Sequence, residues 1–101
     1  MTEKEYYIVK AIEECAEVQK ALTKIMVFGP DDFDPREQNP RNNIQKFHEE
    51  WSDLQECVDL MSEHQVIPHL PRGFLAAHRA MKHDKMHHYL EWAKEQGTVK
   101  E

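Results

Sequence analysis

The chain has 101 residues, of which 40% are hydrophobic, a length that suits one small domain and excludes two separate cores. Nineteen acidic and thirteen basic residues give a net charge of −6, and such a surface repels nucleic-acid polymers and anionic membranes unless a metal ion intervenes. No apolar run approaches the roughly 18 to 20 residues that a membrane span needs. The first residues, MTEKEYY, are too charged for a signal peptide. We therefore expect a soluble cytoplasmic protein.

A first long helix is predicted over residues 3–28. Apolar side chains recur there at helical spacing without an internal glycine or proline. Gly29 and Pro30 end the helix, because glycine adopts the left-handed conformation after a last turn and proline forbids continuation. Residues 29–39 hold turn formers throughout and predict a loop of a length that is often functional.

A second helix is predicted over about residues 40–64. Asn39 and Pro40 can supply the cap and first position, and Asn42 with Gln45 forms a competing cap pair slightly later. The expected buried stripe of this helix consists of Ile44, Phe47, Trp51, Leu54, Val58 and Met61.

A third helix is predicted over about residues 74–96, where Gly97 stops it. Its apolar pattern is weaker, because Lys85 shares a face with Phe74, Met81 and Trp92. No stretch alternates with the period of a strand. We expect an all-α fold with a single domain over residues 1–101, a bundle of three main helices completed into a four-helix-type core by a second copy, as a homodimer or homotetramer.

Cysteines and histidines give weaker signals. Cys15 and Cys57 have apolar neighbours and no Cys-x-x-Cys spacing, which favours buried reduced thiols. His83 and His87 stand four residues apart and could chelate a transition metal on a helix, but no cysteine or third spaced ligand accompanies them. Solvated surface histidines are the favoured interpretation.

One short pattern occurs twice, as EECAEVQKAL at residues 13–22 and as EEWSDLQECV at residues 49–58. Acids three residues apart lie on one flank of a helix. Glu14 and Glu17 flank the apolar stripe of the first predicted helix, and Glu50 and Asp53 occupy the same edge of the second. Two matched pairs on consecutive helices are more specific than either pair alone.

If the two helices pack antiparallel, these four carboxylates border the same seam. Like charges in a partly desolvated groove raise one another's pKa and oppose folding, and a divalent cation resolves that conflict. Carboxylate oxygens suit Mg²⁺ or Mn²⁺, and the absence of His or Cys among the four argues against zinc. We therefore predict a metal site at Glu14, Glu17, Glu50 and Asp53 that holds one to three Mg²⁺ ions.

The paired motif, together with FG at the end of the first helix and a lysine-bearing third helix, resembles the MazG-like all-α nucleotide pyrophosphohydrolases, particularly short single-domain versions encoded by bacteriophages. Trp51, Ser52 and Val27 depart from that pattern, which commonly has leucine, glycine and a basic residue there. The resemblance implies cleavage of a nucleoside triphosphate to its monophosphate and pyrophosphate, in the host cytoplasm for a phage-encoded protein. It also implies that Glu14, Glu17, Glu50 and Asp53 are the catalytic metal ligands.

An anionic substrate also needs cations and a means of recognising the base. Lys82 and Lys85 on the third predicted helix are the first candidates for phosphate contacts, and Lys24 is a further one. Asn43, Trp51 and Phe33 are candidates for base recognition, although Trp51 also suits the core. Glu17 is the favoured acceptor of a proton from the attacking water, but spacing does not choose among the four acids.

Three alternatives remain open. A phosphoribosyl-ATP pyrophosphohydrolase shares the acid pattern and the helical bundle. A non-catalytic module could use the acids only for metal-stabilised assembly or partner binding. A di-iron carboxylate bundle ranks last, because such sites typically include Glu-x-x-His, whereas here Glu17 and Asp53 follow the first acids.

Overall fold

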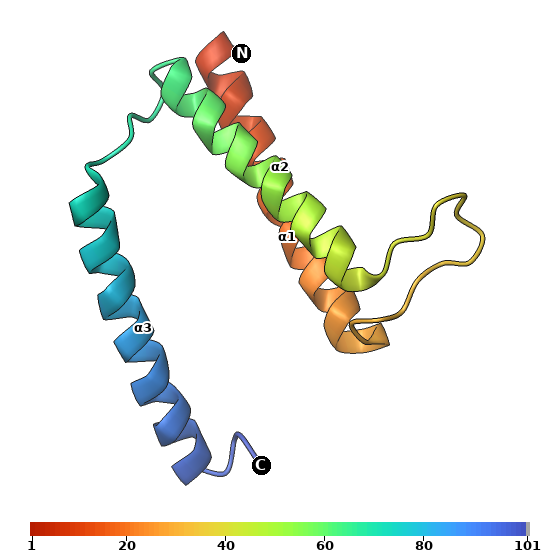
Figure 1. Ribbon diagram of the computed structural model, residues 1–101. Helices are drawn as coiled ribbons and strands as arrows, with labels where there is room; N and C mark the ends of the chain where they lie inside the picture. The colour runs from red at the N-terminus through yellow and green to blue at the C-terminus, as the bar shows by residue number, and fades with distance from the viewer. Residues whose placement is uncertain (101) are drawn as a thin grey trace. The chain divides into compact units, whose positions relative to one another are not determined.

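A computed structural model describes residues 1–100, and these residues form three α-helices and no strand (Figure 1). The helices are α1, Glu3–Phe28; α2, Asn43–Glu63; and α3, Arg72–Glu95. The chain divides into two compact units, of which Met1–Pro68 contains α1 and α2, and the residues from His69 onward contain α3. The prediction of an all-α fold with three main helices is confirmed. A core completed by a second copy and a single domain over the whole chain stay predictions.

The ends of α1 and α2 follow from local chemistry. The Thr2 hydroxyl accepts a hydrogen bond from the Glu5 amide, and Gly29 ends α1 with a φ of 95°. At the start of α2, the Asn42 side chain accepts from the Gln45 amide at 2.9 Å, and the Gln45 side chain accepts from the Asn42 amide at 2.8 Å. The later of the two predicted helix starts is therefore correct, and α2 begins at Asn43 rather than at residue 40.

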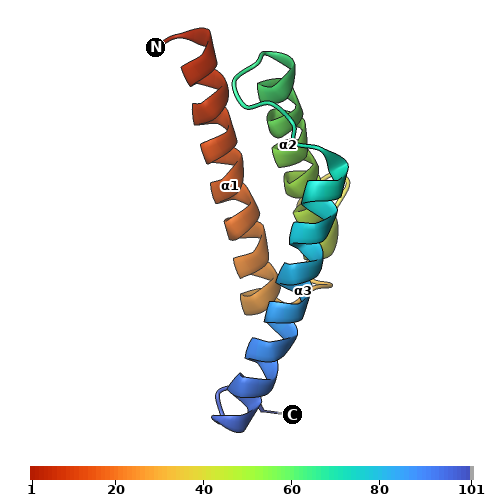
Figure 2. The ribbon, with the colours of Figure 1, turned by 90° about the vertical axis from the view of Figure 1, so that its left-hand side faces the viewer.

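Helices α1 and α2 lie side by side and run antiparallel, as the two perpendicular views agree (Figures 1 and 2). At one end of this hairpin, the Tyr7 hydroxyl and His64 Nε2 are 3.0 Å apart, and their rings stack. At the other end, the Asn43 amide nitrogen donates to the Gly29 carbonyl at 2.9 Å. The antiparallel packing that was the condition for the four carboxylates to border one seam is therefore met.

The seam between the two helices is a run of side chains spaced alternately three and four residues apart, the spacing that keeps one side of a helix facing its partner. All of them are buried or half-buried. Ala11 and Ala21 are the small, buried residues of α1 that allow close approach. The seam consists of Tyr7, Ala11, Glu14, Val18, Ala21 and Ile25 from α1, and Asn43, Phe47, Glu50, Leu54, Cys57 and Met61 from α2.

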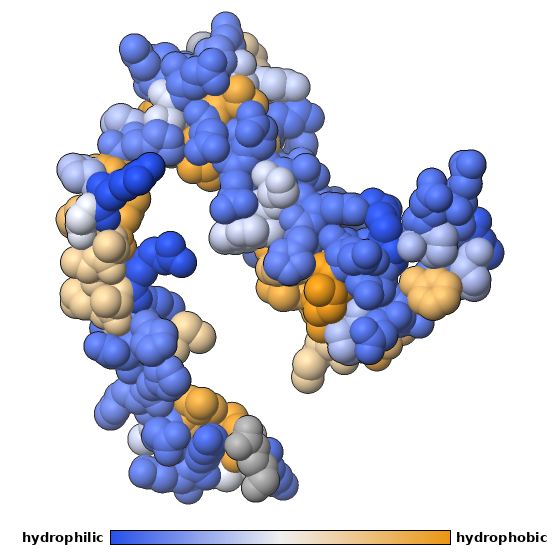
Figure 3. All heavy atoms as spheres, viewed as in Figure 1, coloured by the Kyte–Doolittle hydropathy of each residue, from blue (hydrophilic) through white to orange (hydrophobic). Residues whose placement is uncertain are grey.

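The predicted apolar stripes are only partly buried in the single chain. Trp51 is 43% exposed and Val58 is 41% exposed, although both were predicted to be buried. The reason is that Glu14 and Glu50 occupy the middle of the seam, so apolar residues about 100° further round each helix remain at its side. We call these residues the apolar flank: Ile8, Ile12, Leu22 and Met26 of α1, and Ile44, Trp51 and Val58 of α2. Apolar side chains reach the surface of the hairpin among charged ones (Figure 3).

Helix α3 begins two residues before its predicted start and ends one residue before its predicted end. None of its side chains is buried, and Phe74, Met81 and Trp92 are between 58% and 60% exposed. Gly97 lies just beyond the helix with a φ of 77°. Within residues 1–100, no helix combines the length and the apolarity that crossing a bilayer requires.

A substitution of Asn43 tests what stabilises the hairpin. This residue is 5% exposed, and its side-chain amide nitrogen donates to the Gly29 carbonyl. Replacing Asn43 by Ala removes that donor from a buried position, and we expect the free energy of unfolding to fall by about 1 to 3 kcal/mol. Urea denaturation followed by circular dichroism measures the change. Asn39→Ala, at an exposed loop position, is the control and should have little effect. An equal loss in both variants would contradict a specific role for Asn43.

Candidate metal and active site

Three carboxylates converge across the seam. Glu14 projects from α1, Glu50 and Asp53 project from α2, and one oxygen atom of each lies within 4.8 Å of those of the others. Glu14 and Glu50 are half-buried, and Asp53 is exposed. These three residues come from both copies of the doubled motif, so the predicted convergence of the motifs is observed for them. We call this group the acid cluster.

Burial and repulsion act together on Glu50. Desolvation raises its pKa above the ordinary 4.5, and the charges of Asp53, Glu17, Glu14 and Glu49 raise it further, in that order. The cluster therefore destabilises the folded chain when its carboxylates are ionised and no cation is bound. A cation between them would remove that penalty.

Glu17 and Cys57 lie next to the cluster. Glu17 is exposed and is not one of the three converging acids. Its charge nevertheless raises the pKa of Glu50, and Glu17 and Glu50 line one groove. Burial raises the pKa of the Cys57 thiol, and the charges of Glu14 and Asp53 raise it further. The same acids that converge on Glu50 therefore also disfavour a thiolate at Cys57 when no cation is bound.

A groove of about 290 Å³ continues from Glu17 and Glu50 toward the loop. Four cationic side chains line it, with Glu49, Ala21 and Asn43 completing its wall. The cations come from three parts of the hairpin: Lys20 and Lys24 from α1, Arg41 from the loop, and Lys46 from α2. We call this the cationic groove. It lies on the side of the hairpin that carries Asp53, since Glu17, Lys24 and Lys46 project to the same flank as Asp53.

Two of these cations already have acidic partners. Arg41 pairs with Glu49, and the Lys46 ammonium lies 2.8 Å from a Glu37 oxygen. Within residues 1–100, no ion pair is found for Lys20 or Lys24. An anion that entered the groove would therefore meet two ammonium groups without an ion pair, those of Lys20 and Lys24. It would also meet two cations that already have acidic partners, the Arg41 guanidinium and the Lys46 ammonium.

The loop between α1 and α2 is held by hydrogen bonds. The Arg36 amide, Nε and Nη2 all donate to the Asp34 carboxylate at 2.9 Å, which lowers the pKa of Asp34 from 3.8 to about 2. The backbone N–H of Asn43 also donates to the Asp32 carbonyl at 3.0 Å. This loop carries Phe33, 51% exposed, beside a second hollow that shares Lys24 and Lys46 with the cationic groove.

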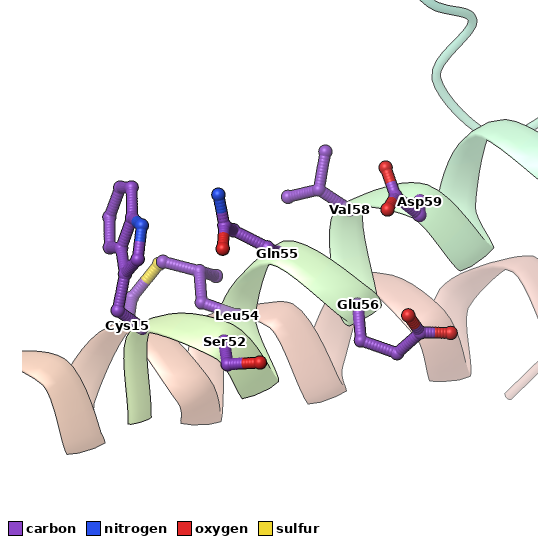
Figure 4. Close-up of a pocket in the computed structure, with 8 residues that line it drawn as sticks. Cys15, Ser52, Leu54, Gln55, Glu56, Val58 and Asp59 are labelled. Atoms are coloured by element: carbon purple, nitrogen blue, oxygen red, sulfur yellow. The ribbon is translucent and has the colours of Figure 1, made fainter. Parts of the chain in front are cut away.

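On the opposite flank lies a groove of about 720 Å³ whose exposed lining is more apolar than polar, although Ser52, Gln55, Glu56 and Asp59 also line it. We call it the apolar groove. Figure 4 shows Cys15 from α1 beside Leu54, Gln55 and Val58 from α2. Trp51 also lines this groove, so its indole is on the apolar flank rather than at the cationic groove. Its side chain contributes apolar surface there.

Sequence reasoning found part of the site. Lys24 and Asn43 line the cationic groove, and the Asn43 amide nitrogen is already bonded to the Gly29 carbonyl. Lys82 and Lys85 lie on α3, in the second unit, and their role in binding stays a prediction. Sequence reasoning missed Lys20, Arg41 and Lys46. Lys20 follows Glu17 by three residues and Lys46 precedes Glu50 by four, a helical spacing that could have revealed both.

The acid cluster has the chemistry that Mg²⁺ prefers. All three donors are carboxylate oxygens, the ligand type of hard divalent cations, and none of the three is a His or Cys. Two oxygens on one Mg²⁺ lie at most about 4.2 Å apart, because each bond is about 2.1 Å long. The three oxygens lie within 4.8 Å of one another, so they would have to move closer together to share one ion. The donor chemistry of Glu14, Glu50 and Asp53 is compatible with Mg²⁺ or Mn²⁺.

Comparison with known proteins yields no relative: no family model, no curated protein and no solved structure matches the chain.

The raised pKa of Glu50 predicts a pH-dependent stability. The folded chain binds the proton of the Glu50 carboxyl more tightly than the unfolded chain does. The stability that this proton adds is therefore fully present below about pH 4.5 and is lost as the pH rises through the raised pKa. Without divalent ions, Glu50→Gln should therefore be more stable than the parent at neutral pH. Its advantage should grow as the pH rises above 4.5 and then level off.

Urea unfolding across that pH range, in the presence of a chelator, measures the difference. Glu63→Gln, an exposed position at the end of α2, is the matched control and should track the parent. A difference between Glu50→Gln and the parent that does not change with pH would disprove the electrostatic origin of the effect.

Proposed function

We propose that this protein is a Mg²⁺-dependent nucleotide pyrophosphohydrolase, which cleaves a ribo- or deoxyribonucleoside triphosphate to its monophosphate and pyrophosphate and so serves nucleotide-pool housekeeping. The single observation that carries the proposal is the convergence of Glu14, Glu50 and Asp53 across the seam, directly beside a groove lined by four cations. An acid cluster that binds metal and an adjacent anion-binding groove are the two parts that phosphoanhydride hydrolysis requires.

The acid cluster would hold the ion through Glu14, Glu50 and Asp53, with Glu17 available as a further ligand or as the base. When bound, Mg²⁺ supplies charge neutralisation for the phosphates and makes water a stronger acid. Glu17 is exposed and lines the groove next to Glu50, so it can accept the proton of the attacking water. The water oxygen forms a bond to the α-phosphorus, the bond from that phosphorus to the bridging oxygen breaks, and pyrophosphate leaves.

The cationic groove would hold the phosphates. Lys20 and Lys24 offer ammonium groups on α1, and Arg41 offers a guanidinium that binds phosphate through two parallel hydrogen bonds. Phe33 lies beside the adjoining hollow, where an exposed aromatic ring suits stacking on a base. We therefore favour Phe33 over Trp51 as the base contact, since Trp51 lines the apolar groove.

The apolar flank supports self-association. Ile12, Leu22 and Met26 are between 50% and 87% exposed, and they lie on the same side as Trp51 and Val58. A second copy covering this side would complete a four-helix-type core and leave the cationic groove open. We propose a homodimer or homotetramer acting in the cytoplasm on nucleoside triphosphates, without a nucleic-acid polymer or a membrane as partner.

Loss of the acid cluster should abolish turnover without unfolding the chain. Glu50→Ala and Asp53→Ala remove metal ligands, and they also relieve like-charge repulsion, so helical content by circular dichroism should be retained. The assay incubates a panel of canonical and modified nucleotides with Mg²⁺ and measures monophosphate and pyrophosphate separately. We expect equimolar monophosphate and pyrophosphate from the parent and none above background from either variant.

Glu63→Gln is the control for this experiment and should retain parental activity. An active Glu50→Ala protein would contradict the proposal. Hydrolysis of phosphoribosyl-ATP alone would instead identify the related pyrophosphohydrolase. If Mg²⁺ raised the melting temperature while no triphosphate was consumed, the chain would be a non-catalytic metal-stabilised module.

Lys24 gives a separate test of the groove. Its ammonium has no acidic partner within residues 1–100, so Lys24→Gln should weaken phosphate contacts while leaving the metal ligands intact. We expect kcat/KM to fall by about 10- to 100-fold, the value of one hydrogen bond to a charged group. Steady-state kinetics measures it, with Lys4→Gln as the control on the same helix. Parental kinetics for Lys24→Gln, with a large loss for Lys82→Gln or Lys85→Gln, would move the phosphate site to α3.

A further inference from the structure

Two histidines of α3 direct their ring nitrogens at each other. His83 Nε2 and His87 Nε2 are 3.3 Å apart, and the ring centroids are 4.5 Å apart with the planes tilted by 60°. The spacing of four residues alone favours surface histidines, because any two helical positions four apart are neighbours. The geometry adds that the same nitrogen, Nε2, of each ring lies at the contact between them.

We propose that His83 and His87 form a chelating site for a divalent transition-metal ion of the zinc class. In a tetrahedral zinc site each Zn–N bond is about 2.0 to 2.1 Å, so two ligand nitrogens lie about 3.3 Å apart. The observed Nε2 to Nε2 distance is 3.3 Å, so the spacing of the two nitrogens already matches that of two ligands on one zinc ion. Water or further donors would fill the other two positions.

Asp84 acts as a positioning residue for this site. Its Oδ1 lies 3.6 Å from Nδ1 of His83, the ring nitrogen that does not contact His87. A carboxylate there favours the proton on Nδ1 and leaves the lone pair on Nε2, where a metal ion would bind. Carboxylates orient metal-binding histidines in this way in many zinc sites.

The site is accessible to a metal ion. The His83 side chain is 70% exposed. With about 100° per residue, His83 and His87 lie about 180° and 220° round the helix from Phe74, and so opposite the face of Phe74, Met81 and Trp92. Ala76 and Ala80 are the small neighbours on the histidine face. A partner that covers the apolar face of α3 would therefore leave the two imidazoles open.

The ligand chemistry separates this site from the acid cluster. Imidazole nitrogens suit zinc, copper and nickel, whereas the carboxylates of Glu14, Glu50 and Asp53 suit magnesium and manganese. The histidine site shares no residue with the proposed hydrolase site. Each proposal can therefore fail without the other.

The test is a zinc titration of the ¹⁵N-labelled full chain, without an affinity tag and with Mg²⁺ in excess to occupy carboxylates. Long-range proton–nitrogen spectra resolve the ring nitrogens of the histidines. We expect Zn²⁺ to shift Nε2 of His83 and His87 and to leave the other five rings unchanged. In His83→Ala or His87→Ala, affinity should fall by about 10²-fold, because the second bond of a chelate forms at a high effective concentration.

His88→Ala, on the same helix, is the matched control and should bind zinc as the parent does. Asp84→Asn should weaken zinc binding less than loss of either ring, and in the metal-free chain it should raise the fraction of His83 protonated on Nε2. Circular dichroism checks that each variant keeps its helical content, as expected at exposed positions. Parental zinc affinity in His83→Ala, or zinc-induced shifts confined to other histidines, would overturn the proposal and reduce the pair to a hydrogen bond between two rings.

Discussion

Two acids occupy packing positions between α1 and α2, and the rest of the hairpin depends on that placement. Glu14 and Glu50 take places in the seam where an apolar side chain would normally sit, between Ala11 and Val18 on one helix and between Phe47 and Leu54 on the other. Half-burial of two like charges opposes folding, and no cationic side chain of the hairpin makes an ion pair with either acid. The α1–α2 pair is therefore less stable at its middle than an apolar seam would be, a local conflict that is expected at functional sites.

This placement also divides the hairpin into two unlike flanks. Residues one position before or after a seam acid are turned by about 100°, and residues three positions after it by about 60° in the direction of the preceding residue, so the direction of the turn decides the flank. On α2, Trp51 turns to the apolar flank, whereas Glu49 and Asp53 turn to the charged one. The same division holds on α1, where Cys15 and Glu17 lie on opposite sides. One flank thus suits association, and the other suits an anionic ligand.

The elements of the fold and the core of the acid cluster could be predicted from the sequence, because helical spacing and capping chemistry are local. The end of α1 was marked by Gly29, and the start of α2 was marked by the cap pair of Asn42 and Gln45. The doubled motif indicated that Glu14 and Glu50 lie close together. The face of each helix that forms the seam could not be predicted, because apolar residues cover a wide arc and Ile12 fits that arc as well as Val18 does. Which face is buried depends on the partner helix.

The cationic groove could be predicted only in part, for a different reason. Arg41 and Glu37 lie in the loop, where no period relates sequence distance to position in space, and only the fold brings them beside Lys46 and Glu49. Helical spacing could have suggested Lys20 and Lys46, but only together with knowledge of the seam. Spacing also could not give the orientation of the His83 and His87 rings, which depends on their rotamers.

The ion pairs of the groove are compatible with exchange. The side chains of Arg41 and Glu49 are each 46% exposed, and ion pairs that are exposed to solvent contribute little to stability. A triphosphate carries more negative charge than one carboxylate, and guanidinium binds phosphate through two parallel hydrogen bonds. If a triphosphate binds in the cationic groove, as we propose, its phosphates can take the place of Glu49 at Arg41 and of Glu37 at Lys46. While the groove is empty, Glu49 and Glu37 stay paired with Arg41 and Lys46 and offset their charges. The hairpin can therefore hold four cations around a small cavity with little mutual repulsion.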